Sequence, residues 1–251
     1  MKKLKLFAIA TVALLGFSGA ANAETVLLAA DDFVGISFWV ISMGMLAATA
    51  FFFMERGSVA SGWKTSVTVA GLVTGIAFIH YMYMRGVWVQ TGESPTVYRY
   101  IDWLITVPLQ IIEFYLILKV CTNVSSSLFW KLLGASLVML IAGFMGETGS
   151  APANAAGIVG VIAWLYIIYE VFSGEAGKLN ASSGNAAAQS AFGTIRLIVT
   201  IGWAIYPIGY WVGVGDNADM ANANLIYNYA DFINKIAFGL AIYVAAVSDS
   251  E

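Results

Sequence analysis

One apolar stretch of the chain, residues 99–113, reads RYIDWLITVPLQIIE and carries several polar side chains. They are Arg99, Asp102, Thr106, Gln110 and Glu113. At 100° per residue on a helix, all five fall within one arc of about 80°. Such a helix turns a single polar stripe toward a protein interior and an apolar surface elsewhere. Because ionisable groups at membrane depth are costly, the stripe predicts a path for protons.

A lysine lies in the middle of the last apolar stretch, in the segment Asp231-Phe232-Ile233-Asn234-Lys235. Its amine is about 12 residues, roughly 18 Å, from either end of that stretch, too deep for the side chain to reach the headgroups. Asp231 lies one turn earlier on the same face and is its expected partner. Two explanations remain open. The pair could only fix packing, or the desolvated amine could condense with an aldehyde to a Schiff base.

The composition requires a membrane setting for these groups. The 251 residues are 60% hydrophobic and only 11% charged, against about 25% charged in soluble proteins. A formal net charge of −3 offers no basic patch for nucleic acid. A single cysteine, Cys121, excludes an intrachain disulfide or a cysteine metal cluster, and no metal site is expected. We interpret Cys121 as an inert, small hydrophobic residue.

Seven stretches are long enough to cross a bilayer, which needs roughly 20 apolar residues per helix. They cover residues 33–54, 65–87, 98–120, 128–146, 153–172, 192–214 and 223–247, with a Gly/Asn/Ser-rich break at 173–190. The expected fold is therefore an all-α membrane protein, a bundle of seven transmembrane helices. An extracellular N-terminus and a cytoplasmic C-terminus would place most Lys and Arg residues on the inner side.

The first residues resemble a targeting signal rather than part of the fold. Three lysines precede the apolar run 6–17, and Ala21-Asn22-Ala23 supplies a small-residue cleavage site. We expect residues 1–23 to be a removed signal peptide and residues 24–251 to form one seven-helix domain. Removal of the signal leaves the N-terminus outside, in agreement with the charge bias.

Three motifs resemble those of the microbial rhodopsins, and most of all the proteorhodopsins, over essentially the whole mature chain. They are RYIDWLITVP at 99–108, WAIYP at 203–207 and DFINK at 231–235. The resemblance implies all-trans retinal bound to Lys235 as a protonated Schiff base. It also implies a pocket of residues that line the retinal: Tyr81, Trp103, Gln110, Trp203, Tyr206, Pro207 and Tyr210. Without the resemblance, ordinary core packing would be the favoured explanation of the aromatic residues among these.

The same resemblance assigns the proton path. Asp102 would accept the Schiff base proton, Glu113 would return one from the cytoplasmic side, and Asp231 would complete the counterion. Arg99 would keep the outer carboxylates ionised, and Thr106 would hydrogen-bond Asp102. The triplet Asp102, Thr106, Glu113 is similar to that of proton pumps and differs from those of chloride pumps, sodium pumps and most sensors. The archaeal outer glutamate pair has no match, so the release group is undetermined.

His80, Trp39 and Glu147 have two readings each, and Gln110 has one. His80, the only histidine, could be a packing residue, but Ile79-His80-Tyr81-Met82 resembles a segment whose histidine tunes the proton acceptor. Trp39 could be an interfacial anchor, or it could meet His80 of a neighbouring subunit. Gln110 resembles the residue of blue-absorbing members, because a polar amide beside a conjugated chain changes its excitation energy. Glu147, at the end of the fourth span, could be a plain interfacial carboxylate or could take part in proton exit.

The sequence thus predicts a blue-absorbing, light-driven outward proton pump rather than an enzyme. We expect it in the bacterial inner membrane, with the lipid bilayer around it, as a homo-oligomeric ring of five or six copies and without an obligate protein partner. A slow sensory rhodopsin that acts through a partner is the alternative, and Glu113 argues against it. A retinal-free seven-helix transporter or receptor is a third possibility.

Overall fold

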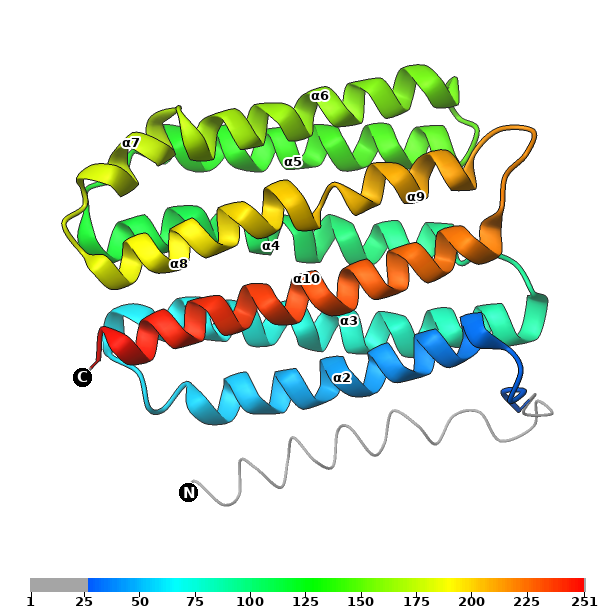
Figure 1. Ribbon diagram of the computed structural model, residues 1–251, viewed down its shortest axis with the longest axis horizontal. Coiled ribbons are helices and arrows are strands. Elements are labelled where there is room, and N and C mark those ends of the chain that lie inside the picture. Colours follow the sequence, from blue (N-terminus) through cyan, green and yellow to red (C-terminus); the bar gives the residue numbers. More distant parts are fainter. Residues whose placement is uncertain (1–26, 251) are drawn as a thin grey trace.

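Seven long apolar helices run side by side in the computed structural model, which describes residues 27–250 (Figure 1). They are α2 (Phe33–Glu55), α3 (Lys64–Thr91, after a 3₁₀ turn at Ser61–Trp63), α4 (Thr96–Cys121), α5 (Ser126–Glu147), α6 (Ala153–Phe172), the broken helix α8 (Ala186–Leu197) and α9 (Ile205–Gly213), and α10 (Met220–Ser248). No strand occurs among the described residues. The predicted all-α, seven-span fold is confirmed, whereas the predicted signal peptide, residues 1–23, lies outside the described residues.

Polar side chains start several of these helices. Asp32, Ser125, Asn185 and Asp219 each accept a hydrogen bond from a backbone N–H three residues later, which satisfies one of the free donors of the first turn. At Asp219 the bond from the Asn222 backbone N–H holds the pKa of the carboxyl below its usual value. These caps fix where each span begins.

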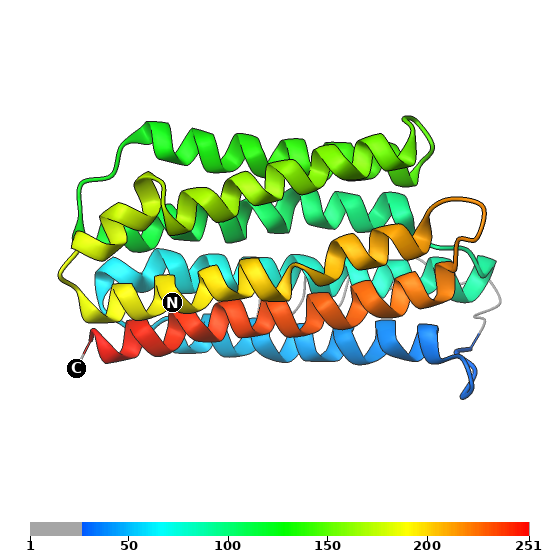
Figure 2. The same ribbon diagram turned by 45° about the horizontal axis from the view of Figure 1, so that its top comes forward.

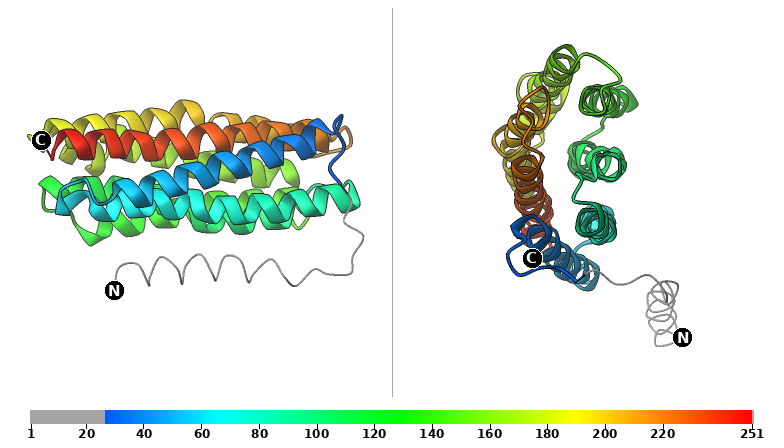
Figure 3. Two further views of the ribbon diagram at one scale, coloured as in Figure 1. Left: turned by 90° about the horizontal axis from the view of Figure 1, so that it is seen from below. Right: turned by 90° about the vertical axis from the view of Figure 1, so that its right-hand side faces the viewer.

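The helices form two rows, which the end-on view in Figure 3 shows clearly. One row holds α6, α8–α9, α10 and α2, and the other holds α5, α4 and α3. The middle helices of the two rows, α4 and α10, therefore face each other across the bundle. They are the helices that carry the two polar segments of the sequence.

The bundle has two ends, which we name by one residue each. The Asp32 end holds the start of α2 and Glu147, and the Asp249 end holds the last turn of α10 and Trp63. Large apolar side chains such as Ile201, Val244 and Ile162 are well exposed on the outer faces between the ends. A lipid surrounding would cover such faces.

The sixth span differs from the expected single helix at 192–214. It begins earlier, at Ala186, and a π-helical turn at Ile198–Gly202 interrupts it before α9 (Figure 1 and Figure 2). Trp164 Nε1 donates to the Val199 carbonyl at 2.8 Å, and Asn234 Nδ2 donates to the Gly202 carbonyl at 3.0 Å. These side chains satisfy backbone groups of the irregular turn.

The break expected at 173–190 also contains a short helix, α7 (Glu175–Ser182). The buried carboxylate of Glu170 in α6 accepts hydrogen bonds from the backbone N–H groups of Glu175 and Ala176, at 2.7 and 3.3 Å. Since a carboxylate at a helix N-terminus satisfies free donors, this contact accounts for a helix that composition alone did not predict.

Candidate functional site

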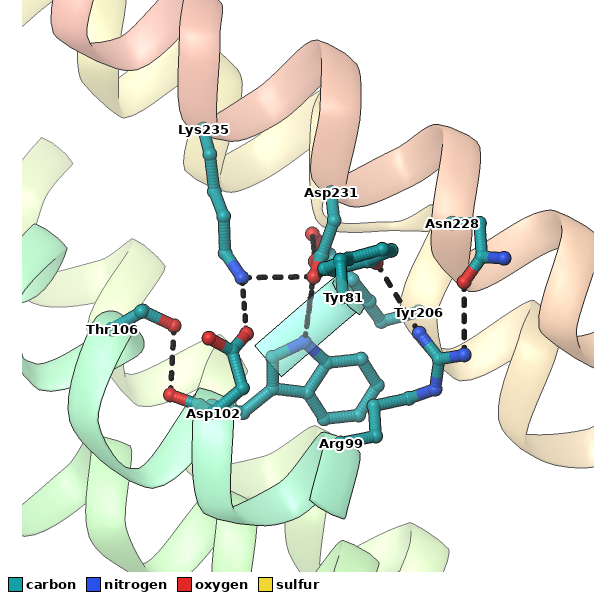
Figure 4. A network of polar contacts seen from close by, with 9 residues as sticks. Tyr81, Arg99, Asp102, Thr106, Tyr206, Asn228, Asp231 and Lys235 are labelled. Carbon is teal, nitrogen blue, oxygen red and sulfur yellow. Dashed lines mark hydrogen bonds and ion pairs between the residues drawn. The ribbon is translucent and has the colours of Figure 1, made fainter. Parts of the chain in front are cut away.

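Lys235 lies between two carboxylates at the centre of the bundle (Figure 4). Its Nζ is 2.5 Å from Oδ2 of Asp102 in α4 and 2.8 Å from Oδ2 of Asp231 in α10. All three side chains are fully buried. Lys235, expected at mid-membrane depth, lies near the middle of α10 (Met220–Ser248). Its partners are Asp102 and the predicted Asp231.

The two carboxylates differ in their surroundings. Asp231 accepts hydrogen bonds from Tyr81 Oη at 2.9 Å, Trp103 Nε1 at 3.2 Å and Tyr206 Oη at 2.7 Å. Asp102 Oδ2 is bonded only to Lys235, and its Oδ1 has no partner among the described residues. Hydrogen bonds to the ionised form stabilise it, so Asp231 is held as an anion more strongly than Asp102. Asp102 is the carboxylate better placed to take up a proton.

Arg99 lies next to this group, toward the Asp32 end. Its guanidinium donates to Asn224 Oδ1 at 2.7 Å, to Asn228 Oδ1 at 2.9 Å and to Tyr81 Oη at 3.3 Å. The described residues show no direct ion pair between Arg99 and either Asp. Arg99 reaches Asp231 through the Tyr81 hydroxyl, so its influence on the carboxylates is indirect.

Thr106 and His80 were both expected to act on Asp102. Thr106 Oγ1 donates to the backbone carbonyl of Asp102 at 3.0 Å, as a helical Ser or Thr often does, and not to the carboxylate. The hydrogen bond expected from Thr106 to Asp102 is therefore present, and its acceptor is the backbone carbonyl. His80 is half-buried and has no hydrogen bond to Asp102 in the described structure. Trp39 is partly exposed, and the Arg85 guanidinium lies 4.7 Å from its ring centre.

The half of the stripe toward the Asp249 end is buried. Glu113 is 1% exposed, and neither of its carboxyl oxygens has a hydrogen bond among the described residues. Gln110 is buried as well, and its amide nitrogen has no partner there. Glu113 lies 11 residues along α4 from Asp102, about 16 Å toward the Asp249 end. A carboxyl group in such surroundings is more easily kept neutral than ionised.

A cavity adjoins the Lys235 group. Its volume is about 100 Å³. The lining combines aromatic rings with glycines: Tyr100, Trp103, Gly143, Gly157, Gly160, Trp164, Trp203, Tyr206, Pro207, Tyr210, Trp211 and Tyr227, together with four aliphatic residues. Five of the predicted pocket residues, Trp103, Trp203, Tyr206, Pro207 and Tyr210, line it.

Two side chains connect the cavity to the Lys235 group. Trp103 and Tyr206 both line the cavity and both donate to Asp231, which is bonded to Lys235. A long apolar aldehyde with its reactive end at Lys235 Nζ fits this combination of an amine, two carboxylates and an aromatic slot. Tyr81 and Gln110 do not line the cavity. Tyr81 lies between Asp231 and Arg99 instead.

Two asparagines of the site were not predicted from the sequence. Asn224 and Asn228 hold Arg99, and the Asn228 amide also donates to Ser37 Oγ at 2.8 Å. The signal was present, because Asn224, Asn228, Asp231 and Lys235 follow one another at intervals of 4, 3 and 4 residues. This spacing puts the four side chains on one face of the helix, so the seventh span carries a polar stripe as the third span does.

Comparisons with known proteins show which proteins this chain resembles. Residues 32–248 match the family described as "Bacteriorhodopsin-like protein". The chain is 55% identical to the blue-light absorbing proteorhodopsin of Gamma-proteobacterium Hot 75m4, over 100% of this chain and 99% of that protein. It is 58% identical to the green-light absorbing proteorhodopsin of Gamma-proteobacterium EBAC31A08, over 89% and 90% of the two chains.

A solved structure gives the same result for the fold. The crystal structure of the blue light-absorbing proteorhodopsin from Med12 has a TM-score of 0.77 and 60% sequence identity to this chain. The similarity covers 86% of this chain and 99% of that one.

Proposed function

Because this chain belongs to the bacteriorhodopsin-like family, and its proteorhodopsin relatives indicate a light-driven proton pump, we propose that it moves protons out of the cell with all-trans retinal attached to Lys235. One observation carries the proposal. The fully buried amine of Lys235 lies 2.5 Å from the Asp102 carboxylate and 2.8 Å from the Asp231 carboxylate. A third buried carboxyl group, that of Glu113, lies further along α4, the helix that carries Asp102.

The chain's residues fit the cofactor. Lys235 Nζ is the attachment point, and Trp103, Trp203, Tyr206 and Pro207 enclose the space beside it. When bound, retinal supplies a light-absorbing chain whose change of shape alters the position and acidity of a proton at Nζ. The aromatic walls exclude water and fix the orientation of that chain.

Asp102 accepts the proton at Oδ2, the atom already in contact with Nζ. Asp231 accepts hydrogen bonds from three donors besides the lysine, so it stays ionised and favours a proton on Lys235 Nζ. Arg99 acts on Asp231 from the Asp32 end through the Tyr81 hydroxyl. The proton therefore leaves Nζ toward one defined acceptor.

Glu113 returns a proton to Nζ from the other side. Its burial and its unpartnered oxygens favour a neutral carboxyl group that can donate. Asp102 and Glu113 lie on opposite sides of Lys235 along the bundle, so the two transfers together move one proton across the membrane. Transport outward requires the Asp32 end to face outside and the Asp249 end to face the cytoplasm.

The remaining finer expectations belong to the same proposal. We propose the blue-absorbing class because of Gln110; the relatives from Hot 75m4 and Med12 are blue-absorbing, and the one from EBAC31A08 is green-absorbing. We infer residence in the bacterial inner membrane after removal of residues 1–23. We also infer assembly into a ring of five or six copies, in which Trp39 of one copy meets His80 of the next, while His80 tunes Asp102 electrostatically.

Two measurements test the function. Purified protein mixed with all-trans retinal should become coloured, and borohydride reduction under illumination should fix retinal on Lys235. Illuminated cells should acidify the medium, and an uncoupler should abolish the change. Protein that stays colourless contradicts the whole proposal. A pigment that recovers from a flash only after seconds, without acidification, supports the sensory alternative.

A further inference from the structure

A groove on the outer surface of the bundle lies apart from the central site. Helices α5 and α6 pack side by side at the ends of the two rows of helices (Figure 3). Between them is an open groove of about 580 Å³. Its lining comes only from these two helices, and none of its lining residues also lines the central cavity. The groove is therefore separate from the proposed retinal site.

The groove is apolar and about as long as half of a membrane span. Gly134 of α5 leaves its floor open, because a Cβ atom there would meet nothing within 4 Å. Val138 of α5 and Ile162 of α6 form exposed apolar walls. From Trp130 to Val138 the lining extends about 12 Å along α5. One leaflet contributes about 15 Å of hydrocarbon, so the groove fits one acyl chain and is too short for a membrane-spanning helix.

A charged pair lies at the Asp249 end of the groove. Lys131, which lines the groove, has its Nζ 3.1 Å from Oε2 of Glu175, the first residue of α7. Ser125 Oγ donates to the other oxygen, Oε1, at 2.7 Å. The Lys131 side chain is 43% exposed and that of Glu175 is 32% exposed. The two charges cancel, and both groups remain accessible to a ligand.

The pair has unused hydrogen-bonding capacity. An ammonium group has three N–H donors, and Lys131 uses one of them on Glu175. A carboxylate can accept about four hydrogen bonds, and Glu175 accepts two from described residues. Trp130 and Tyr166 line the same end of the groove, and both residue types are typical of the depth of lipid headgroups. The mouth of the groove therefore offers both donors and acceptors at headgroup depth.

We propose that this groove binds one phospholipid whose headgroup carries a phosphate and a primary ammonium group, that is, a phosphatidylethanolamine. The phosphate accepts hydrogen bonds from Lys131, and the ammonium group donates to Glu175. One acyl chain lies in the groove along Gly134 and Val138. The headgroup and the charged pair are thus complementary in charge, and the chain and the groove are complementary in polarity and length.

The charges around the mouth favour this headgroup over two common alternatives. A second carboxylate, Glu170, also acts electrostatically on Lys131. An anionic headgroup without an ammonium group would add a negative charge beside Glu170 and Glu175, which repel it. A choline headgroup has no N–H with which to donate to Glu175. The zwitterion with a primary ammonium group satisfies both members of the pair.

Native mass spectrometry of the full-length, retinal-loaded protein in a mild detergent tests the site. Phosphatidylethanolamine, phosphatidylglycerol or phosphatidylcholine with identical acyl chains is added, and the dissociation constant of the first bound lipid is measured. The wild type should bind phosphatidylethanolamine at least about fivefold more tightly than either of the others. Equal affinities for the three lipids, or a preference for phosphatidylglycerol, would overturn the proposal.

Two substitutions test the charged pair. Lys131→Gln and Glu175→Gln each remove one charge-assisted contact and should abolish the preference for phosphatidylethanolamine over phosphatidylcholine. The matched control is Lys178→Gln, which changes an exposed lysine of α7 that does not line the groove and should keep the preference. The absorption spectrum of the pigment shows whether each variant is folded. A wild-type preference in both Lys131→Gln and Glu175→Gln contradicts the assignment.

Gly134→Leu tests the part of the site that holds the acyl chain. Leucine fills the open floor without a clash and replaces a glycine inside a helix, so the protein should remain folded. Affinity for all three lipids should fall about tenfold. Gly193→Leu on α8, where a Cβ also meets nothing within 4 Å and which lies outside the groove, should leave affinity unchanged. If Gly134→Leu alters the number of copies per assembly but not lipid affinity, the groove is a contact between copies and the proposal fails.

Discussion

Lys235 is paired with two buried acids at once, and burial of these charges is costly for a protein in which they only fix packing. Asp102 and Asp231 both lie within hydrogen-bond distance of its amine and are sealed from solvent. A buried ion pair adds little net stability, because desolvation offsets the attraction, but removal of one partner is expensive. The arrangement is best explained by proton transfer rather than by packing.

The cost can be measured in the retinal-free protein. Lys235→Met leaves two buried carboxylates without their cation and should lower the free energy of unfolding by about 3–5 kcal/mol. Addition of Asp102→Asn should restore part of that loss, since one uncompensated acid is removed. Denaturation in detergent would compare both with Lys178→Met, an exposed control. A Lys235→Met protein as stable as the wild type would show that the amine is not the counter-charge.

Gln110 gives a prediction at a single residue that concerns colour alone. Replacement by Leu removes a buried polar amide and should move the absorption maximum of the retinal-bound protein to longer wavelength. Gln90→Leu changes an exposed glutamine and should leave the spectrum in place. Equal spectra for Gln110→Leu and the wild type would exclude Gln110 as the residue that sets the colour.

Residue types and spacing were enough to find the central lysine and its acids, while the resemblance to the microbial rhodopsins indicated five of the residues that line the cavity. They were not enough for contacts that depend on rotamers and on the depth at which helices pack. Thr106 could equally reach the carboxylate or the backbone carbonyl of Asp102, and the structure has the latter. The convergence of Tyr100 and Tyr227 on Glu147 joins residues 47 and 80 positions apart in the chain, a relation that no local pattern contains.

Among the elements, the broken sixth span is the one that depends most on its neighbours. In the π-helical turn at Ile198–Gly202, Trp203 N–H bonds the Ile198 carbonyl five residues back. Pro207 follows and has no N–H to donate to the Trp203 carbonyl. The apolar sequence predicted the span itself, but the break follows from contacts with α6 and α10.

Trp164 makes one of those contacts and can be tested. Trp164→Phe keeps an aromatic ring in the cavity wall but leaves the Val199 carbonyl without its 2.8 Å partner. An unsatisfied buried carbonyl costs about 1–3 kcal/mol, so the thermal midpoint of unfolding should fall. Trp130→Phe, in an exposed position, should have little effect. Equal midpoints for the two variants would show that the Trp164 bond does not support the turn.

At the scale of the whole molecule, the Asp249 end is closed by the last residues of the chain. Asp249 accepts hydrogen bonds from Trp63 Nε1 at 2.7 Å and from Asn185 Nδ2 at 3.0 Å, and Ser250 Oγ accepts one from the Ala60 N–H. These contacts join the segment before α3 and the segment before α8 to the end of α10, beside Cys121. Asp249→Ala should therefore raise the rate at which a maleimide labels Cys121, whereas Asp219→Ala, at the other end, should not. Equal rates in both variants would contradict the closure.

The direction of transport depends on the whole bundle, because it follows from which acids lie at which end. Asp102, Arg99 and Glu147 lie toward the Asp32 end, while Glu113 lies about 16 Å from Asp102 toward the Asp249 end. A proton that leaves Nζ toward Asp102 and is replaced from Glu113 moves from the Asp249 end to the Asp32 end.

Inverted membrane vesicles should therefore take up protons in light, while intact cells acidify their medium. In both preparations Glu113→Gln should slow recovery after a flash without a reversal of direction, because it removes the return donor and leaves the acceptor in place. Lys64→Gln, a partly exposed control near the same end, should keep the wild-type rate. Acidification outside inverted vesicles would mean that the Asp32 end faces the cytoplasm, and the orientation inferred from the charge bias would be wrong.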